Sequence, residues 1–320
     1  MREIFIDAGD VRLRAMVEGN GPLVLMVHGF PESWYSWRHQ LAPVASAGFT
    51  ACAIDVRGYG ASDKPPEVAA YAMERMIGDL VGIADALVPG EPAILVGHDW
   101  GAPIVWNSAL VRPDAFRAVA ALSIPYTGVT PRPYDELFAA AFTAHNRFFY
   151  QAYFQAEGVA EAELEADERG FLRRFYYMLS GDAPVESWPA HKTADATLLT
   201  EMIDPARFPP WLDDADLDYY VTEFARSGLR GPLNRYRNHR RDWDFLQAYK
   251  DLRIEQPALF IGGTRDLAFS MIGRGDPIET MRRYVPNLAG AHMLAGCGHW
   301  TQQERPAEVN DLLLSWLRAL

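Results

Sequence analysis

The stretch "AILVGHDWGAP", residues 93 to 103, combines the signals of a strand, a turn and a helix. Its apolar residues 94–96 suit a buried strand, and Gly97 and Gly101 flank a short polar turn before a helical pattern begins. Glycines beside a turn allow a sharp bend and a close approach of neighbouring backbone. We therefore expect a strand, a tight turn and a helix, with the side chain of Asp99 at the tip of the turn.

Short apolar runs alternate with helical stretches on both sides of this motif. The runs are "LVLMVHG", "TACAID", "AILVG" and "AVAALSI", then "PALFIGG" and "GAHMLAG" near the end of the chain, with helical stretches at 34–47, 71–87, 102–111 and 307–317. Runs that are apolar throughout are typical of parallel strands covered by helices on both faces. "EIFIDA" and "VRLRAMV" precede them and indicate an antiparallel hairpin around Gly9 and Asp10. We predict an α/β fold.

The pattern changes in the middle of the chain, from about Thr127 to Trp243. Aromatic and acidic residues dominate there at helical spacing, without a convincing parallel strand, and "SGDAPVESWPAHK" and "PARFPPW" are irregular and contain proline. This pattern predicts a helical insertion. We expect residues 1–127 and 244–320 to form the core, and residues 128–243 to form a helical cap over an active site.

Composition narrows the class of protein. Of the 320 residues, 49% are hydrophobic and 22% charged, which is ordinary for a globular protein, and the net charge of -12 argues against nucleic-acid binding. The chain lacks the pattern of a secretory leader and any run near the roughly 18 apolar residues of a membrane span. Two cysteines without metal-ligand spacing suggest neither a disulfide framework nor a metal site. We expect a cytoplasmic protein without metal, cofactor or membrane insertion.

Asp99, Asp266 and His299 occur in the chain order nucleophile, acid, base. Asp266 ends the strand-like "PALFIGGTRD", and His299 follows another apolar run in "GCGHW". A helix-capping aspartate, a turn aspartate and a structural histidine could explain the three residues one by one, but their order and placement favour a catalytic set. Asp276, in the loop-like "GRGDP", is a weaker candidate for the acid because it is farther from a strand end.

An aspartate nucleophile suits attack on a saturated carbon. Its carboxylate is already ionised at neutral pH and can displace a leaving group to form an alkyl ester on the enzyme. His299, oriented by Asp266, would then activate water to attack the ester carbonyl. We expect the backbone N–H groups of Trp100 and of Phe30, in "VHGFPES", to form an oxyanion hole, and His28 to brace that loop.

These motifs resemble the α/β-hydrolase superfamily, and within it the epoxide hydrolases of the soluble type. The similarity covers nearly the whole chain and includes "HGFPESWYSW", "DVRGYGASDKP", "GHDWGA" and "GCGHWTQQERPAEVNDLLLSWL". In the insertion, "FYQAYFQAEGVAEAELE" and "GPLNRYRN" are similar to the lid motifs of that family. The resemblance implies an α/β-hydrolase fold with a cap, and conversion of an apolar epoxide to a vicinal diol.

The resemblance also implies two cap tyrosines, Tyr150 and Tyr236, that hold and protonate the epoxide oxygen. A phenol with a pKa of about 10 can donate to an alkoxide without being ionised at rest. Tyr153, three residues after Tyr150, is the competing residue and could instead pack in the core of the cap. The candidates for lining the substrate pocket are Phe149, Phe154 and Trp188, each of which could equally pack the cap.

Two other functions remain open. Dehalogenases share the aspartate nucleophile. Haloalkane dehalogenases usually pair the tryptophan at the Trp100 position with an Asn or with a tryptophan from the lid. Phe30 stands at the Asn position here, and Trp188 is a candidate for the lid tryptophan. Fluoroacetate dehalogenases, which act on a haloacid, carry arginines beside the nucleophile, and "WGAPIVWN" has none. A noncatalytic binding protein would most simply have lost a triad member. The sequence leaves open which epoxide is used, the selectivity of ring opening and the oligomeric state.

Overall fold

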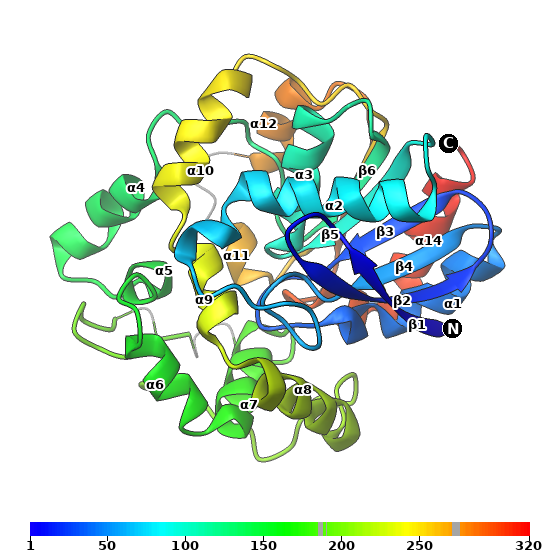
Figure 1. The fold of residues 1–320 in the computed structure, drawn as a ribbon. Helices are drawn as coiled ribbons and strands as arrows, with labels where there is room; N and C mark the ends of the chain where they lie inside the picture. Colours follow the sequence, from blue (N-terminus) through cyan, green and yellow to red (C-terminus); the bar gives the residue numbers. More distant parts are fainter. Residues whose placement is uncertain (185–187, 190, 271–275) are drawn as a thin grey trace.

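An eight-stranded sheet forms the centre of the protein (Figure 1) in the computed structural model, which describes residues 1–184, 188–189, 191–270 and 276–320. The strands are β1 (Arg2–Asp7), β2 (Arg12–Gly19), β3 (Leu23–Val27), β4 (Thr50–Ile54), β5 (Ala93–His98), β6 (Phe116–Leu122), β7 (Ala258–Gly263) and β8 (Leu288–Leu294). Their order in the sheet is β1-β2-β4-β3-β5-β6-β7-β8. The β1–β2 and β2–β4 pairs are antiparallel and the remaining pairs are parallel, which confirms the predicted α/β fold.

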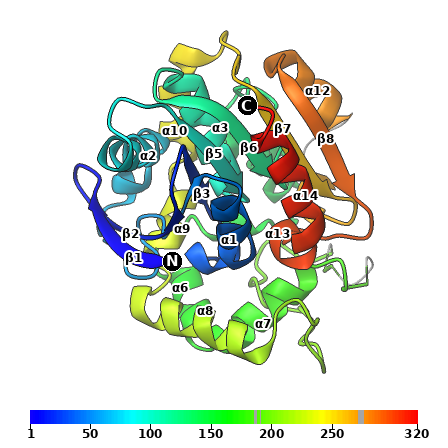
Figure 2. The same ribbon diagram turned by 90° about the vertical axis from the view of Figure 1, so that its right-hand side faces the viewer.

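Helices cover both faces of the sheet. Figure 2 shows α1 (Arg38–Ser46) and α14 (Pro306–Leu317) side by side across one face, and α2 (Met73–Leu87) and α3 (Gly101–Val111) cover the other. Alternate side chains of a strand point to opposite faces. Val24 and Met26 of β3 therefore join the apolar cluster under α1 and α14, and Leu25 and Val27 join the cluster under α2 and α3.

The boundaries of two core helices differ from the prediction. The stretch 34–47 begins as a 3-10 helix, η1 (Trp34–Trp37), before α1, because Ser33 caps that first turn by accepting from the N–H of Tyr35. In the stretch 71–87, α2 begins only at Met73, after the 3-10 helix η2 (Val68–Tyr71). Neither difference changes the layer in which these helices lie.

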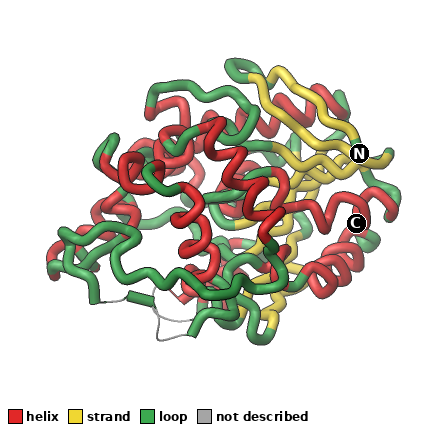
Figure 3. Tube along the Cα trace, turned by 90° about the horizontal axis from the view of Figure 1, so that it is seen from below, coloured by secondary structure: helices red, strands yellow, loops and turns green. Residues whose placement is uncertain are grey.

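The chain between β6 and β7 forms a second, largely helical layer, which we call the cap. Its elements are α4 (Tyr134–Ala141), η3 (Thr143–His145), α5 (Tyr150–Tyr153), α6 (Val159–Glu165), α7 (Glu168–Leu179), α8 (Asp214–Ser227), α9 (Arg230–Tyr236), α10 (His239–Leu246) and η5 (Gln247–Tyr249). Figure 3 shows the strands gathered towards the two termini and the cap on the opposite side. The predicted cap limits, 128 and 243, stay a prediction, and α10 continues across the second limit.

Three further core helices are short or lie at the sheet edge. They are α11 (Leu267–Ser270), which follows β7, and α12 (Pro277–Tyr284), and the four-residue α13 (Thr301–Glu304) precedes α14. The weaker acid candidate Asp276 caps α12 by accepting from the N–H of Ile278. Within the part of the chain that the structure describes, no helix has the length and apolar character needed to cross a bilayer. The cytoplasmic location stays a prediction.

Buried ion pairs attach the cap to the core through α8. Arg14 of β2 donates from Nε to Oδ2 of Asp55 at 2.6 Å and also forms an ion pair with Glu223 of α8. Arg38 of α1 lies 3.1 Å from the carboxylate of Asp216, near the start of α8. Removing one partner of a buried pair leaves an uncompensated charge, so these contacts fix the position of α8 on the core.

Candidate active site

Asp99 lies at the tip of the turn between β5 and α3, in a conformation that few residues adopt. Its φ is 48°, in the left-handed region, which side chains other than glycine occupy mainly where their surroundings enforce it. A Cβ on Gly97 would lie 2.3 Å from the carbonyl oxygen of Gly101, and a Cβ on Gly101 would lie 2.0 Å from that of Val27. Both glycines are therefore required for the turn to pack against β3.

The carboxylate of Asp99 has different partners on its two oxygens. Oδ1 accepts from the backbone N–H of Phe30 at 2.7 Å, and Oδ2 lies 3.3 Å from Nε2 of His299. The side chain is 16% exposed, so it is accessible from the cap side. The N–H of Trp100 belongs to the first turn of α3, where backbone donors have no acceptor within the helix. One of the two donors predicted for the oxyanion hole, the N–H of Phe30, is thus already hydrogen-bonded to the carboxylate.

The contact between the Phe30 N–H and the Asp99 carboxylate is possible because residue 29 is a glycine. A Cβ there would lie 2.3 Å from Oδ1 of Asp99, closer than any real contact permits. His28 holds the same loop, accepting from the N–H of Val56 at Nε2 (3.1 Å) and donating from Nδ1 to the carbonyl of Gly29 (2.8 Å). These bonds require neutral His28, and burial lowers its pKa. The bracing role predicted for His28 agrees with this geometry.

His299 lies between two carboxylates. Its Nδ1 is 3.0 Å from Oδ1 of Asp266, and that oxygen also accepts from the N–H of Ala268 at 2.8 Å. Burial alone would lower the pKa of His299, but the charges of Asp266 and Asp99 outweigh it and raise the pKa well above 6.5. Burial of Asp266 acts against ionisation, yet His299 and the hydrogen bonds to it lower the pKa of Asp266. The two carboxylates therefore favour the protonated form of His299 in the resting site.

Glu304 of α13 fixes the backbone around His299. Its carboxylate accepts from the N–H groups of residues 298 and 300, at 2.8 and 3.0 Å, and from Gly181 of the cap at 2.9 Å. The N–H of His299 itself donates to the carbonyl of Leu179 at the end of α7. Burial raises the pKa of Glu304. The loop that carries the candidate base is thus tied directly to the cap.

A buried pair, Glu32 and His98, lies behind the site. His98 donates from Nδ1 to Oε2 of Glu32 and from Nε2 to the carbonyl of His299, both at 2.8 Å. Oε2 also accepts from the N–H of Gly29 at 2.7 Å. Burial acts to raise the pKa of Glu32, but the charge and hydrogen bond of His98 lower it to about 2. This pair joins the segments that carry Phe30, Asp99 and His299.

Tyr150 of α5 and Tyr236 of α9 lie edge to face, close enough to Asp99 for its charge to act on both. Their rings are 5.9 Å apart at 79°, and the ring of Tyr236 is 5.5 Å from Phe30 and 5.2 Å from Trp100. Burial and, next, the charge of Asp99 raise the pKa of both phenols, so both are protonated. Gln151 donates to the Tyr150 oxygen at 2.8 Å, and this leaves the phenolic proton able to donate elsewhere.

Tyr153, the competing residue, has a different role. Its hydroxyl donates to Glu163 of α6 at 2.8 Å, and Glu163 also accepts from the N–H groups of Leu198 and Leu199. The Tyr153 side chain therefore holds the cap together internally. The geometry favours Tyr150 over Tyr153 as the partner of Tyr236.

The three pocket candidates lie in different surroundings. Phe154 is fully buried and its ring contacts Tyr150, Tyr236 and Phe30 at 5.6, 5.0 and 5.8 Å. Phe149 stacks on Phe142 at 4.4 Å, on the α4 side of Tyr150. Trp188 is partly buried against the apolar core, beside residues outside the described range. Phe154 is placed to shape the space at the two phenols, and the pocket roles of all three stay a prediction.

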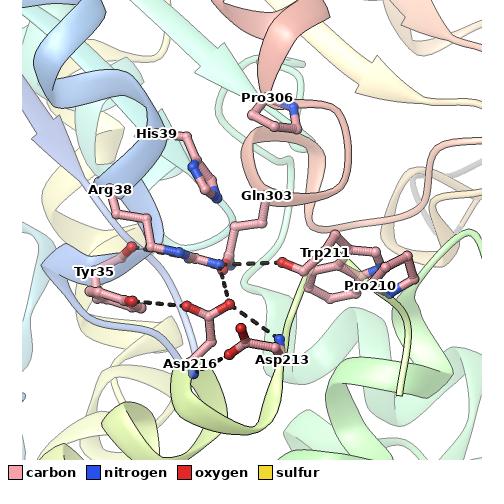
Figure 4. A pocket seen from close by; sticks show the side chains of 9 residues that line it. All are labelled: Tyr35, Arg38, His39, Pro210, Trp211, Asp213, Asp216, Gln303 and Pro306. Carbon is pink, nitrogen blue, oxygen red and sulfur yellow. Dashed lines mark hydrogen bonds and ion pairs between the residues drawn. The ribbon is translucent and has the colours of Figure 1, made fainter. Parts of the chain in front are cut away.

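A cavity among the described residues is lined by none of these groups. It has a volume of about 600 Å³ and lies where α1 and the loop after α13 meet the start of α8 (Figure 4). Its centre is occupied by Arg38, whose guanidinium bonds Asp216, Gln303 and the Trp211 carbonyl. Arg38 and Asp216 pair across the core–cap boundary, so the cavity lies at this boundary, and Asp99 is not among its lining residues.

Several residues of the site had no predicted role. Glu32 lies in "HGFPES" and Glu304 in "TQQERP". Each is a carboxylate within a largely apolar or neutral segment. Ser123, which contacts both Asp266 and His299, follows β6 without any local sequence signal. Among the described residues, no group of three or more histidine, cysteine, aspartate or glutamate side chains is arranged to hold a metal ion.

The sequence of this chain is similar to those of known proteins over most of its length. Residues 22–306 match the family described as alpha/beta hydrolase fold. The chain is similar to epoxide hydrolase A of Mycobacterium tuberculosis, with 40% identity over 99% of this chain and 98% of the relative. It is also similar to epoxide hydrolase B of the same organism, with 38% identity over 94% of this chain and 92% of the relative.

A solved structure is similar over the same extent. The structure of an epoxide hydrolase from an endophytic Streptomyces superposes with a TM-score of 0.92 and 47% identity, and the match covers 99% of this chain and 94% of that one. Similarity of this degree extends through both the sheet and the cap, since it leaves almost none of either chain unmatched.

Proposed function

The chain belongs to the epoxide hydrolases of the α/β-hydrolase fold family, and we propose that it hydrolyses an apolar epoxide with Asp99 as the nucleophile. The observation that carries the proposal is the position of the Asp99 carboxylate, between the Phe30 amide and His299 and close enough to two protonated phenols for its charge to act on both. The phenyl rings around Tyr150 and Tyr236 favour an apolar substrate.

The first step is attack on an epoxide carbon. Oδ1 of Asp99 is held by the Phe30 N–H, so Oδ2 is the oxygen that attacks. A new C–O bond forms between Oδ2 and the carbon as the ring C–O bond breaks, and Tyr150 or Tyr236 gives a proton to the alkoxide that leaves. The product of this step is a hydroxyalkyl ester on Asp99.

The second step is hydrolysis of that ester. Ester formation removes the negative charge of Asp99, and with it one of the two charges that raise the pKa of His299. His299 then gives up its proton, which restores the phenol that donated in the first step, and it can take a proton from water as the water attacks Cγ of Asp99. The oxyanion develops on Oδ1, where the N–H of Phe30 already lies and that of Trp100 is adjacent. When the Cγ–Oδ2 bond breaks, His299 returns this proton to the departing diol oxygen. Collapse of this intermediate releases the vicinal diol and restores the carboxylate.

A substrate panel tests the proposal. Purified protein is incubated with styrene oxide, short aliphatic epoxides and a fatty-acid epoxide, and separately with haloalkanes and fluoroacetate, and both diol and halide are measured. We expect diol from at least one epoxide and no halide, and we expect Asp99→Ala to form no diol, because alanine has no nucleophile. Halide release without diol would assign the aspartate to dehalogenation, and an active Asp99→Ala variant would exclude the covalent route.

A further inference from the structure

Ser123 lies directly after β6 in a strained and fully buried position. Its φ is 73°, in the left-handed region that serine rarely adopts, and its relative exposure is 0%. Its N–H donates to the carbonyl of Ile261 in β7 at 2.9 Å, which holds the backbone at the junction of two strands. Strain of this kind persists where the surroundings require a particular side-chain direction.

The hydroxyl of Ser123 contacts both members of the His299–Asp266 pair. It donates to Oδ2 of Asp266, and its oxygen lies 2.8 Å from Nδ1 of His299. A carboxylate can only accept, so the hydroxyl proton is directed to Asp266. The Ser123 oxygen is then free to accept, and the N–H at Nδ1 is shared between this oxygen and Oδ1 of Asp266, 3.0 Å away.

Two consequences follow for His299. With acceptors on both sides of Nδ1, the proton stays on that nitrogen when the ring becomes neutral, and the lone pair is left on Nε2, the nitrogen that faces Asp99. The hydroxyl also stabilises the charge of Asp266 by hydrogen bonding, and so limits how far Asp266 raises the pKa of His299.

We propose that Ser123 is a positioning residue for ester hydrolysis, acting through His299 and Asp266. The inference rests on the proposed roles of Asp99 and His299. Attack by Asp99 needs no base, so Ser123 affects the second half-reaction and leaves the first unchanged. Losing its hydroxyl should slow ester hydrolysis about 10- to 100-fold, the range for losing a hydrogen bond to a charged group.

Two substitutions separate the hydroxyl from the backbone strain. Ser123→Ala removes the hydroxyl and keeps a Cβ at a φ of 73°, whereas Ser123→Gly removes the hydroxyl and relieves the strain. Ser108 of α3 supplies the matched control, because it is also fully buried and its hydroxyl has no partner among the described residues. Ser108→Ala should behave as the unmodified enzyme.

The measurement is single-turnover kinetics across a range of pH, with the panel epoxide that the unmodified enzyme turns over fastest. Rapid quenching and intact-mass spectrometry follow ester formation and ester loss separately. We expect both Ser123 variants to form the ester at the normal rate, to hydrolyse it more slowly by similar factors, and to need a higher pH for half-maximal hydrolysis. Should Ser123→Ala fail to fold, Ser123→Gly carries the test.

Three results would overturn the proposal: normal hydrolysis in Ser123→Gly, equal slowing of both half-reactions, or slower hydrolysis with an unchanged pH profile. The last two would indicate a structural role only. Failure of the proposed function is distinguishable from these, because the unmodified enzyme itself would then form no ester with any epoxide of the panel.

Discussion

Nε2 of His299 lies 3.3 Å from Oδ2 of Asp99, so the proposed base and the proposed nucleophile form an ion pair in the resting site. Burial disfavours a charged imidazole, but the carboxylates of Asp266 and Asp99 raise the pKa of His299 well above its usual value. Protonated His299 cannot act as a base. Ester formation on Asp99 removes one of the two charges that hold this proton, and so favours the neutral form of His299 that ester hydrolysis needs.

The first prediction concerns the protons exchanged during ester formation at pH 7. Opening the epoxide consumes one proton. We expect no net uptake from solvent, because His299 loses a proton as Asp99 loses its charge. A pH-indicator dye in a stopped-flow single turnover measures this. Ester hydrolysis should then accelerate as pH rises through the pKa of His299 in the ester form, since the neutral ring is the base.

His299→Gln is the control for the proton count, because it forms the ester without an imidazolium to supply the proton. This variant should take up one proton per site. Uptake of one proton by the unmodified enzyme as well would mean that His299 releases no proton when the ester forms, and would contradict the proposed coupling between Asp99 and His299.

The second prediction concerns the two phenols. Tyr150→Phe and Tyr236→Phe should each slow ester formation, and the double variant should lose about 10²- to 10⁴-fold, the usual contribution of a positioned general acid. One remaining phenol can still donate, so each single loss should be smaller. Tyr153→Phe is the matched control from the same helix, because its hydroxyl bonds Glu163 inside the cap. A damaging Tyr153→Phe beside a harmless Tyr150→Phe would reverse the assignment.

The third prediction concerns the glycine beside the oxyanion hole. A Cβ at position 29 would lie 2.3 Å from Oδ1 of Asp99, so Gly29→Ala must displace either the carboxylate or the Phe30 amide. Displacement of reacting groups by about 1 Å can cost around 100-fold in rate, and we expect a loss of kcat of that order.

Gly78 provides the comparison for Gly29. It lies in α2, with open space around a new Cβ, so Gly78→Ala should keep full activity and raise the free energy of unfolding by roughly 0.5–1 kcal/mol. Urea unfolding and steady-state kinetics on both variants check the pair. A fully active Gly29→Ala would show that the contact between the loop and Asp99 is unimportant for the reaction.

Much of the site could be predicted because its signals are local. The strand, turn and helix around Asp99 lie within one short stretch, and Asp266 and His299 each follow an apolar strand. Parallel strands bring such positions together at one edge of the sheet. The fold could therefore be predicted from periodicity, and the order and placement of Asp99, Asp266 and His299 were enough to propose them as one set, which the structure brings together.

The residues without a predicted role depend on distant partners. Ser123 is 143 positions from Asp266 and 176 from His299, and Glu32 is 66 from His98. No local pattern signals such contacts, because they arise only when several strands are in register. The limits of the cap helices are still harder to predict. The helix α5, for example, is only four residues long, and tertiary contacts rather than helix propensity decide its limits.

The last prediction follows the oxygen atoms of Asp99. Oδ2 attacks the epoxide and Oδ1 stays at the Phe30 N–H, so water must add to Cγ to release the diol. In a single turnover in ¹⁸O-water, with enzyme in excess, the diol should therefore be unlabelled and Asp99 should carry the label, as read from the peptide that contains it.

His299→Gln should stop at the ester and gain one substrate mass, because attack needs no base and hydrolysis does. Asp99→Ala, in the same experiment, should gain no mass. Label in the diol from that first turnover would mean that water opens the epoxide directly, with Asp99 as a base, and the two-step mechanism would be wrong.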